Sequence, residues 1–126
     1  MMVPLLQVAF GGALGAVMRY ALMVGVARVF GAGFPLGTLL VNISGSFLMG
    51  VAMGFFAARS GSIWAMPLVT AGVLGGFTTF SAFSLDTVAL WEQGRTVGAL
   101  GYVLISVAGS ILALVLGLAA MRGTPA

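Results

Sequence analysis

A polar, glycine-containing segment interrupts the third hydrophobic stretch of this chain. It is the sequence GGFTTFSAFS at residues 75–84, with paired glycines and four hydroxyl side chains. A helix that faces lipid keeps Leu and Val at such positions, and backbone groups released from a helix inside a membrane must pair with protein, cavity water or an ion. We therefore predict a break near residues 75–79, where carbonyls suit a hard monovalent cation and the following amides suit an anion. A packing kink is the alternative.

Two aromatic side chains lie in the same segment. Phe80 and Phe83 are three residues apart, so they share one face of a helix. The positive edge of an aromatic ring can meet an anion without binding it as tightly as an ammonium group does. A pair that packs in a core or against lipid is the default interpretation, and residue type alone leaves both roles open.

Polar side chains recur at every fourth residue in two other stretches. Each row must face protein or water. The rows are Thr38, Asn42 and Ser46 in the second stretch, and Tyr102, Ser106 and Ser110 in the fourth. Hydrogen bonds between helices, worth less than about 2 kcal/mol each, explain the single Ser and Thr residues. For Asn42, a functional role and a helix-packing role fit equally well.

Ionisable side chains are few. Arg19 is the only basic residue inside a predicted span, where it either extends to the lipid headgroups or attracts an anion at a pore mouth. Asp86 and Glu92 follow the polar segment, and we expect both to cap a helix or pair with a neighbour. An Asp inside a membrane is nevertheless a candidate functional residue.

The elements that must position these side chains are hydrophobic helices. Of the 126 residues, 61% are hydrophobic and 6% charged, whereas an ordinary soluble domain is about a quarter charged. About 20 apolar residues cross a bilayer, and we place four spans at about residues 5–26, 36–57, 63–91 and 97–121. The third would measure roughly 43 Å as one straight helix, too long for a core of about 30 Å. We expect an all-α membrane protein, a single four-helix transmembrane domain over residues 1–126 with the third helix broken.

The first span has two further features. Gly11 and Gly15 are four residues apart, which predicts close packing against another helix. The span lacks a preceding basic region and is too long for a signal-peptide core, so we expect it to stay in the mature protein.

The arginines are distributed evenly between the two ends of the predicted spans. Arg59 and Arg122 lie on the side of both termini, and Arg28 and Arg95 lie on the other. The positive-inside rule therefore gives no orientation. Either another feature sets the orientation, or the chain inserts both ways and pairs with an inverted copy.

Several classes of function are excluded by what the chain lacks. With no His, Cys or Lys and only two carboxylates, it lacks the usual general bases and nucleophiles, so we do not expect an enzyme. Five arginines do not make the dense basic patch that nucleic acids require, so we expect no nucleic-acid partner. A proton-coupled exporter of this size would normally use a carboxylate in its first span, where Arg19 is the only ionisable side chain.

Three local sequences make the chain resemble the Fluc/CrcB family of small fluoride channels over essentially its whole length. GGFTTFSAFS at residues 75–84 is similar to the third-helix signature of that family, and GTLLVN at residues 37–42 to its second-helix motif. GAVMRY at residues 15–20 is similar to the segment that ends in its first-helix arginine. Together the three are highly specific. One departure is Asp86, where some relatives have Glu.

This resemblance implies an antiparallel, dual-topology homodimer in the bacterial inner membrane. Two pores along the subunit interface would let fluoride leave the cytoplasm passively. A structural sodium ion that is not transported would lie at the dimer centre, held by the carbonyls of Gly75 and Thr78. The side chains assigned to the fluoride path are Phe80, Phe83, Asn42, Tyr102, Ser106 and Ser110, with Arg19 and Thr38 nearer the vestibule.

Two other functions remain open at this point. The chain could be a structural or assembly subunit whose glycines and polar rows only pack helices. It could also be a small dual-topology solute exporter. Fluoride efflux from liposomes separates these three functions.

Overall fold

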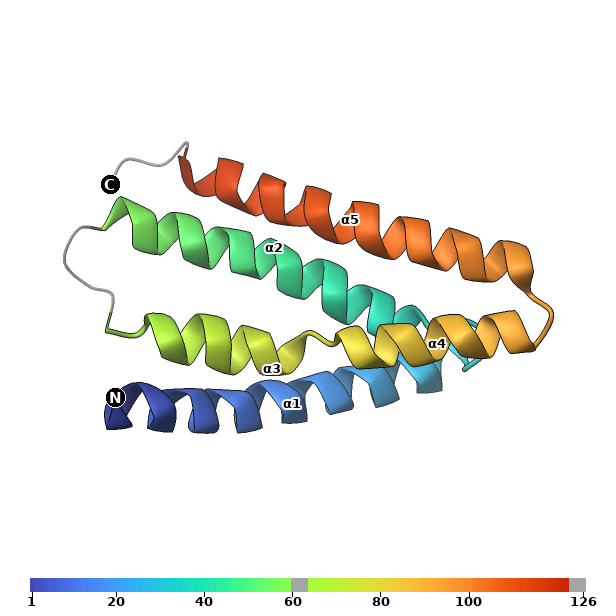
Figure 1. Ribbon diagram of the computed structural model, residues 1–126, viewed down its shortest axis with the longest axis horizontal. Coiled ribbons are helices and arrows are strands. Elements are labelled where there is room, and N and C mark those ends of the chain that lie inside the picture. Colours follow the sequence, from blue (N-terminus) through green and yellow to red (C-terminus); the bar gives the residue numbers. More distant parts are fainter. Residues whose placement is uncertain (60–63, 123–126) are drawn as a thin grey trace.

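The computed structural model describes residues 1–59 and 64–122, which form four long helical segments (Figure 1). Three of them are α1 (Met2–Phe30), α2 (Leu36–Ala58) and α5 (Thr96–Arg122). The third segment in the chain consists of the π-helix η1 (Leu68–Leu74), the single turn α3 (Gly75–Phe77) and α4 (Phe80–Glu92). All four segments are long and apolar enough to cross a membrane, which confirms the all-α prediction. The predicted start of the third span, residue 63, lies outside the described residues.

Helices α1, α2 and α5 extend beyond the predicted spans because hydropathy marks the membrane core and not the end of a helix. α1 continues to Phe30, four residues past the predicted end, and stops where Gly31 adopts a φ of 81°. Only glycine enters this backbone region at little cost. Gly94, between α4 and α5, has a φ of 78° and allows the turn there in the same way.

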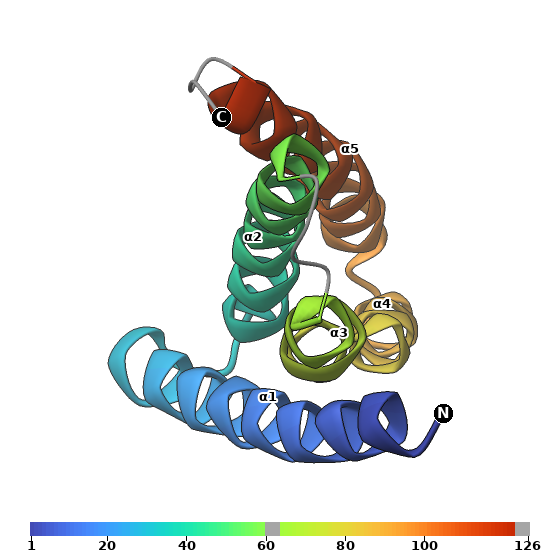
Figure 2. The same cartoon turned by 90° about the vertical axis from the view of Figure 1, so that its left-hand side faces the viewer.

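The segments pack as two pairs joined through the middle of the molecule. α5 packs mainly against α2, while α1 packs mainly against η1 and α3. Figure 2, a view along the third segment, shows α1 and α5 on opposite sides of the molecule. The start of α1 and the end of α5 lie at the same end in Figure 1, as predicted. Arg28, in the last turn of α1, and Arg95, which precedes α5, belong to the opposite end.

Glycines permit the close contact between α1 and the third segment. A Cβ atom added to Gly11 would lie 2.6 Å from the Leu68 carbonyl oxygen, and one added to Gly15 would overlap the Val73 carbonyl. A Cβ at Gly76 would lie 2.6 Å from the carbonyl oxygen of Gly12. The predicted packing role of the α1 glycines is therefore confirmed.

Much of the apolar surface is not covered within one chain. In the most hydrophobic parts of α1 and α5, only 11% of the residues are buried. The remaining apolar side chains must face lipid or another protein chain.

Candidate ion-binding site

The third segment is interrupted at Thr78 and Thr79, inside the predicted range. Their φ and ψ angles are −83° and 158° for Thr78, and −152° and 118° for Thr79. Gly75 is helical, with φ −64° and ψ −38°. The paired glycines thus belong to the turn before the break, and neither has a backbone angle that requires glycine. The small size of Gly76 serves the contact with α1 instead.

Asn42 of α2 binds both backbone groups of Thr79. Its Nδ2 donates to the Thr79 carbonyl at 2.9 Å, and the Thr79 amide donates to its Oδ1 at 2.8 Å. A Cβ at Gly45, one turn further along α2, would overlap the Thr78 side chain, so glycine there lets α2 approach the break. Asn42 therefore makes hydrogen bonds between helices, which is one of the two roles that the sequence left open. Its role in an ion path stays a prediction.

Arg19 also contacts the break. Its Nε donates to the Gly76 carbonyl at 3.1 Å. In an unbroken helix that carbonyl would accept from the amide of Phe80, the first residue of α4. The sequence indicated that Arg19 extends to headgroups or attracts an anion at a pore mouth, and it gave no sign of this backbone contact.

A cavity of about 290 Å³ lies beside the break, between α2, α4 and α5. Its lining residues are Asn42, Ser46, Thr78, Thr79, Phe80, Phe83, Ser106, Val107, Ser110 and Ile111. Most of the predicted site residues therefore share one cavity, and the exceptions are Arg19, Thr38, Gly75 and Tyr102. Ser46 was not assigned to the site, although its position four residues after Asn42 is the signal that could have identified it.

One buried hydroxyl group in this cavity has no hydrogen-bond partner among the described residues. Ser106 is 5% exposed, and its buried Oγ makes no hydrogen bond to any described residue. Buried polar atoms in proteins are nearly always paired with protein, water or a ligand. The Ser106 hydroxyl is thus available to a ligand or a water molecule inside the cavity.

Aromatic rings form one wall of the cavity. The ring centroid of Phe83 lies 5.4 Å from that of Phe80 and 5.4 Å from that of Tyr102. Phe83 is buried, whereas Phe80 is 77% exposed on the surface of the single chain. Phe80 therefore stands at the side of the cavity that a further molecule must cover.

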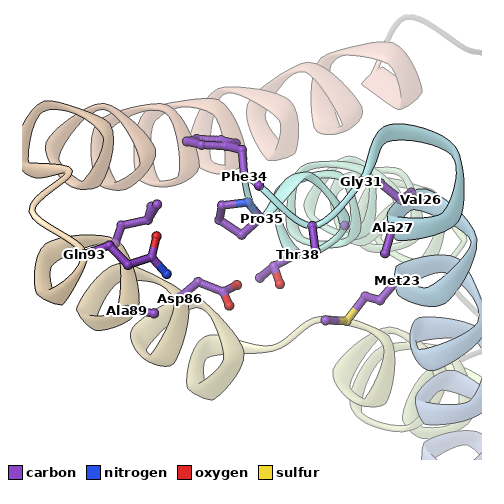
Figure 3. A pocket seen from close by; sticks show the side chains of 14 residues that line it. Met23, Val26, Ala27, Gly31, Phe34, Pro35, Thr38, Asp86, Ala89 and Gln93 are labelled. Carbon is purple, nitrogen blue, oxygen red and sulfur yellow. The ribbon is translucent and has the colours of Figure 1, made fainter.

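Thr38 and Tyr102 belong to the region around a second cavity. This cavity, of about 230 Å³, is lined in part by Thr38 and Asp86, whose side chains point toward each other in Figure 3. The Tyr102 hydroxyl donates to Asp86 Oδ2 at 3.0 Å, which confirms the expectation that Asp86 pairs with a neighbour. The Tyr102 side chain thus contacts one residue of each cavity, Asp86 of the second and Phe83 of the first.

Two backbone carbonyls at the break lose their usual helical donors. In an unbroken helix, the Gly75 carbonyl would accept from the amide of Thr79, and the Thr78 carbonyl from that of Ala82. The Thr79 amide donates instead to Asn42 Oδ1, and the Ala82 amide donates to the Thr79 hydroxyl at 3.1 Å. Within residues 1–59 and 64–122, no side chain donates to either carbonyl. These oxygens therefore fit the ligand set of a hard cation.

Known proteins match this chain over most of its length. A family model described as "CrcB-like protein, Camphor Resistance (CrcB)" matches residues 6–118. A protein of Cereibacter sphaeroides is 55% identical over 119 residues, which cover 94% of both chains. A protein of Mesorhizobium japonicum is 49% identical over 96% of this chain and 98% of its own. One of Paracoccus denitrificans is 52% identical over 94% of both chains. Each of the three is named a fluoride-specific ion channel FluC.

Proposed function

The chain belongs to the CrcB family, and on this premise we propose that it is a fluoride channel through which fluoride leaves the cytoplasm down its electrochemical gradient. Its four spans and its bacterial relatives fit a multi-pass protein of the bacterial inner membrane, with the lipid bilayer as its solvent. The family consists of channels and not enzymes, which agrees with the prediction from the side chains.

The buried, unpaired hydroxyl of Ser106 is the observation that supports this proposal best. Fluoride is a small anion that accepts hydrogen bonds, so it leaves water only where donors replace its hydration shell. The cavity offers hydroxyl donors from Ser46, Ser106 and Ser110, and an amide donor from Asn42. The donors are neutral, which allows an anion to enter and also to leave.

Phe80 and Phe83 supply a second kind of contact in the proposed path. An aromatic ring presents its positive edge to an anion and holds it weakly. Phe83 is fixed between two neighbouring rings, at 5.4 Å from each, and so has a defined orientation at the cavity wall. The remaining residues predicted for the path, Arg19, Thr38 and Tyr102, would act outside this cavity. Arg19 would act through the break, and Thr38 and Tyr102 would act beside the second cavity.

A second copy of the chain in inverted orientation would complete the path. The 77% exposure of Phe80 beside the cavity leaves an aromatic surface that another protein chain can cover. The even division of arginines between the two ends supports insertion in both orientations. The proposed assembly is therefore an antiparallel homodimer.

A structural sodium ion is the proposed cofactor of this dimer. The Gly75 and Thr78 carbonyls of the two copies would hold it, because their helical donors bind elsewhere. Gly75 lies on the exposed surface of the single chain, within reach of a second copy. The ion would neutralise these oxygens and hold the broken helices together without being transported.

Fluoride efflux from liposomes tests the proposal. Purified protein in liposomes loaded with potassium fluoride should release fluoride to an ion-selective electrode when a potassium ionophore is added. Chloride-loaded liposomes serve as the control for general leakage. If the wild-type protein releases no fluoride, the chain is a structural subunit or an exporter of another solute.

A further inference from the structure

Side chains from two helices pair with the backbone at the break in the third segment. Asn42 bonds both the amide and the carbonyl of Thr79, at 2.8 and 2.9 Å. The Thr79 hydroxyl accepts from the Ala82 amide at 3.1 Å and caps α4. Arg19 donates to the Gly76 carbonyl at 3.1 Å. The break is thus stabilised by specific side-chain partners.

The two amides bound in this way are those that would close the helix. Thr79 and Ala82 each follow one of the proposed sodium ligands, Gly75 and Thr78, by four residues. A backbone amide that loses its other partner returns to its helical carbonyl, because an unpaired amide is costly inside a membrane protein. The acceptors on Asn42 and Thr79 therefore compete directly with the two carbonyls.

We propose that Asn42 and Thr79 are positioning residues for the cation, because their side chains bind these two amides and keep the Gly75 and Thr78 carbonyls available to sodium. This inference rests on the proposed sodium site. In this proposal, two side chains that do not touch the ion keep its carbonyl ligands free to bind it. The paired glycines alone do not explain why these carbonyls are free, since Gly75 itself is helical.

Asn42 also connects the cation site with the anion cavity. The Thr79 amide can only donate and its carbonyl can only accept, so a single orientation of the Asn42 side-chain amide satisfies both bonds. An amide nitrogen has two hydrogens, and one remains after the bond to Thr79. Because Asn42 lines the cavity, that second hydrogen is the group it can offer to fluoride.

Replacement by aspartate separates these two roles. Asn42→Asp keeps an acceptor for the Thr79 amide, so sodium binding should persist. It removes the N–H donor and adds negative charge beside the anion cavity, so fluoride efflux should be lost. Asn42→Ala removes both groups, and both properties should decline together.

Equilibrium binding of radioactive sodium to the purified dimer measures the positioning effect without any transport. Asn42→Ala and Thr79→Val should each weaken sodium binding about tenfold or more, which is the equivalent of one lost hydrogen bond. Asn42→Asp and Thr79→Ser should stay within about twofold of the wild type, because they keep the acceptor. Ser44→Ala and Thr87→Val are matched controls, since among the described residues each hydroxyl bonds only carbonyls of its own helix.

The outcomes separate this inference from the function on which it rests. Wild-type sodium affinity in both Asn42→Ala and Thr79→Val would overturn the positioning role and leave the sodium site intact. A wild-type dimer that binds no sodium would overturn the site itself. If Asn42→Ala does not fold, Thr79→Val against Thr79→Ser decides the question, and equal affinities of that pair refute the proposal.

Discussion

Replacement of Phe83 by isoleucine tests whether the aromatic wall serves transport or only packing. Phe83 is buried and contacts two rings at centroid distances of 5.4 Å, so Phe83→Ile loses two aromatic pairs, about 1–3 kcal/mol of folding stability. Phe80→Ile loses one pair, about 0.5–1.5 kcal/mol. If the ring edges stabilise fluoride in the path by about 1.4 kcal/mol, either variant should slow efflux about tenfold. The effect on flux should therefore be similar in the two variants, although their losses of stability differ.

Efflux per folded protein is the quantity to measure, together with thermal unfolding in detergent. Phe56→Ile is a matched control, because Phe56 is 9% exposed and pairs with Phe55 at 5.5 Å, away from the residues that line the cavity. It should lower stability like Phe80→Ile and leave efflux per folded protein unchanged. Wild-type efflux in both Phe80→Ile and Phe83→Ile would refute the role in the path and return the pair to core packing.

Further predictions concern the cavity, the assembly and the cation. Ser106→Ala should slow efflux several-fold with little change in unfolding temperature, because its hydroxyl bonds none of the described residues; a large loss of stability would contradict this. Reporter fusions to either terminus should reveal both orientations in cells, and a single orientation would refute the antiparallel dimer. Gly75→Leu should leave the monomer helical, since the φ of Gly75 suits any residue, but should weaken dimerisation in cross-linking assays. Prolonged replacement of sodium by a large organic cation should lower both efflux and the unfolding temperature of the dimer, and radioactive sodium should not cross with fluoride.

The sequence predicted the helices and the position of the break because both depend on local composition. Long apolar stretches fix the spans, and the hydroxyls of residues 78–84 mark the place where the third span cannot remain a plain helix. The paired glycines and the hydroxyls together predicted a break within residues 75–79. The structure uses Gly76 for contact with α1 and places the extended backbone at Thr78 and Thr79.

Contacts between distant elements were beyond the reach of sequence patterns. The hydrogen bond from Arg19 to Gly76 joins residues 57 positions apart, and nothing in the type or spacing of either residue identifies the other. The reciprocal bonds of Asn42 with Thr79 depend on how closely α2 approaches, which Gly45 permits. Tyr102 was grouped with Ser106 and Ser110 by its spacing, yet its hydroxyl turns toward Asp86 and the second cavity.

The π-helix η1 gives the third segment a tolerance in length. Its hydrogen bonds skip one residue more than those of an α-helix, so η1 acts as a one-residue insertion just before the break. Deletion of one residue within Leu68–Leu74 would return this stretch to α-helical bonding, and the parts of the segment on either side would keep nearly the same faces, because the wider turn of the π-helix has absorbed the extra residue. In a plain α-helix the same deletion would rotate one part against the other by about 100°. The third segment can thus lose one residue in η1 without turning its first half away from α1.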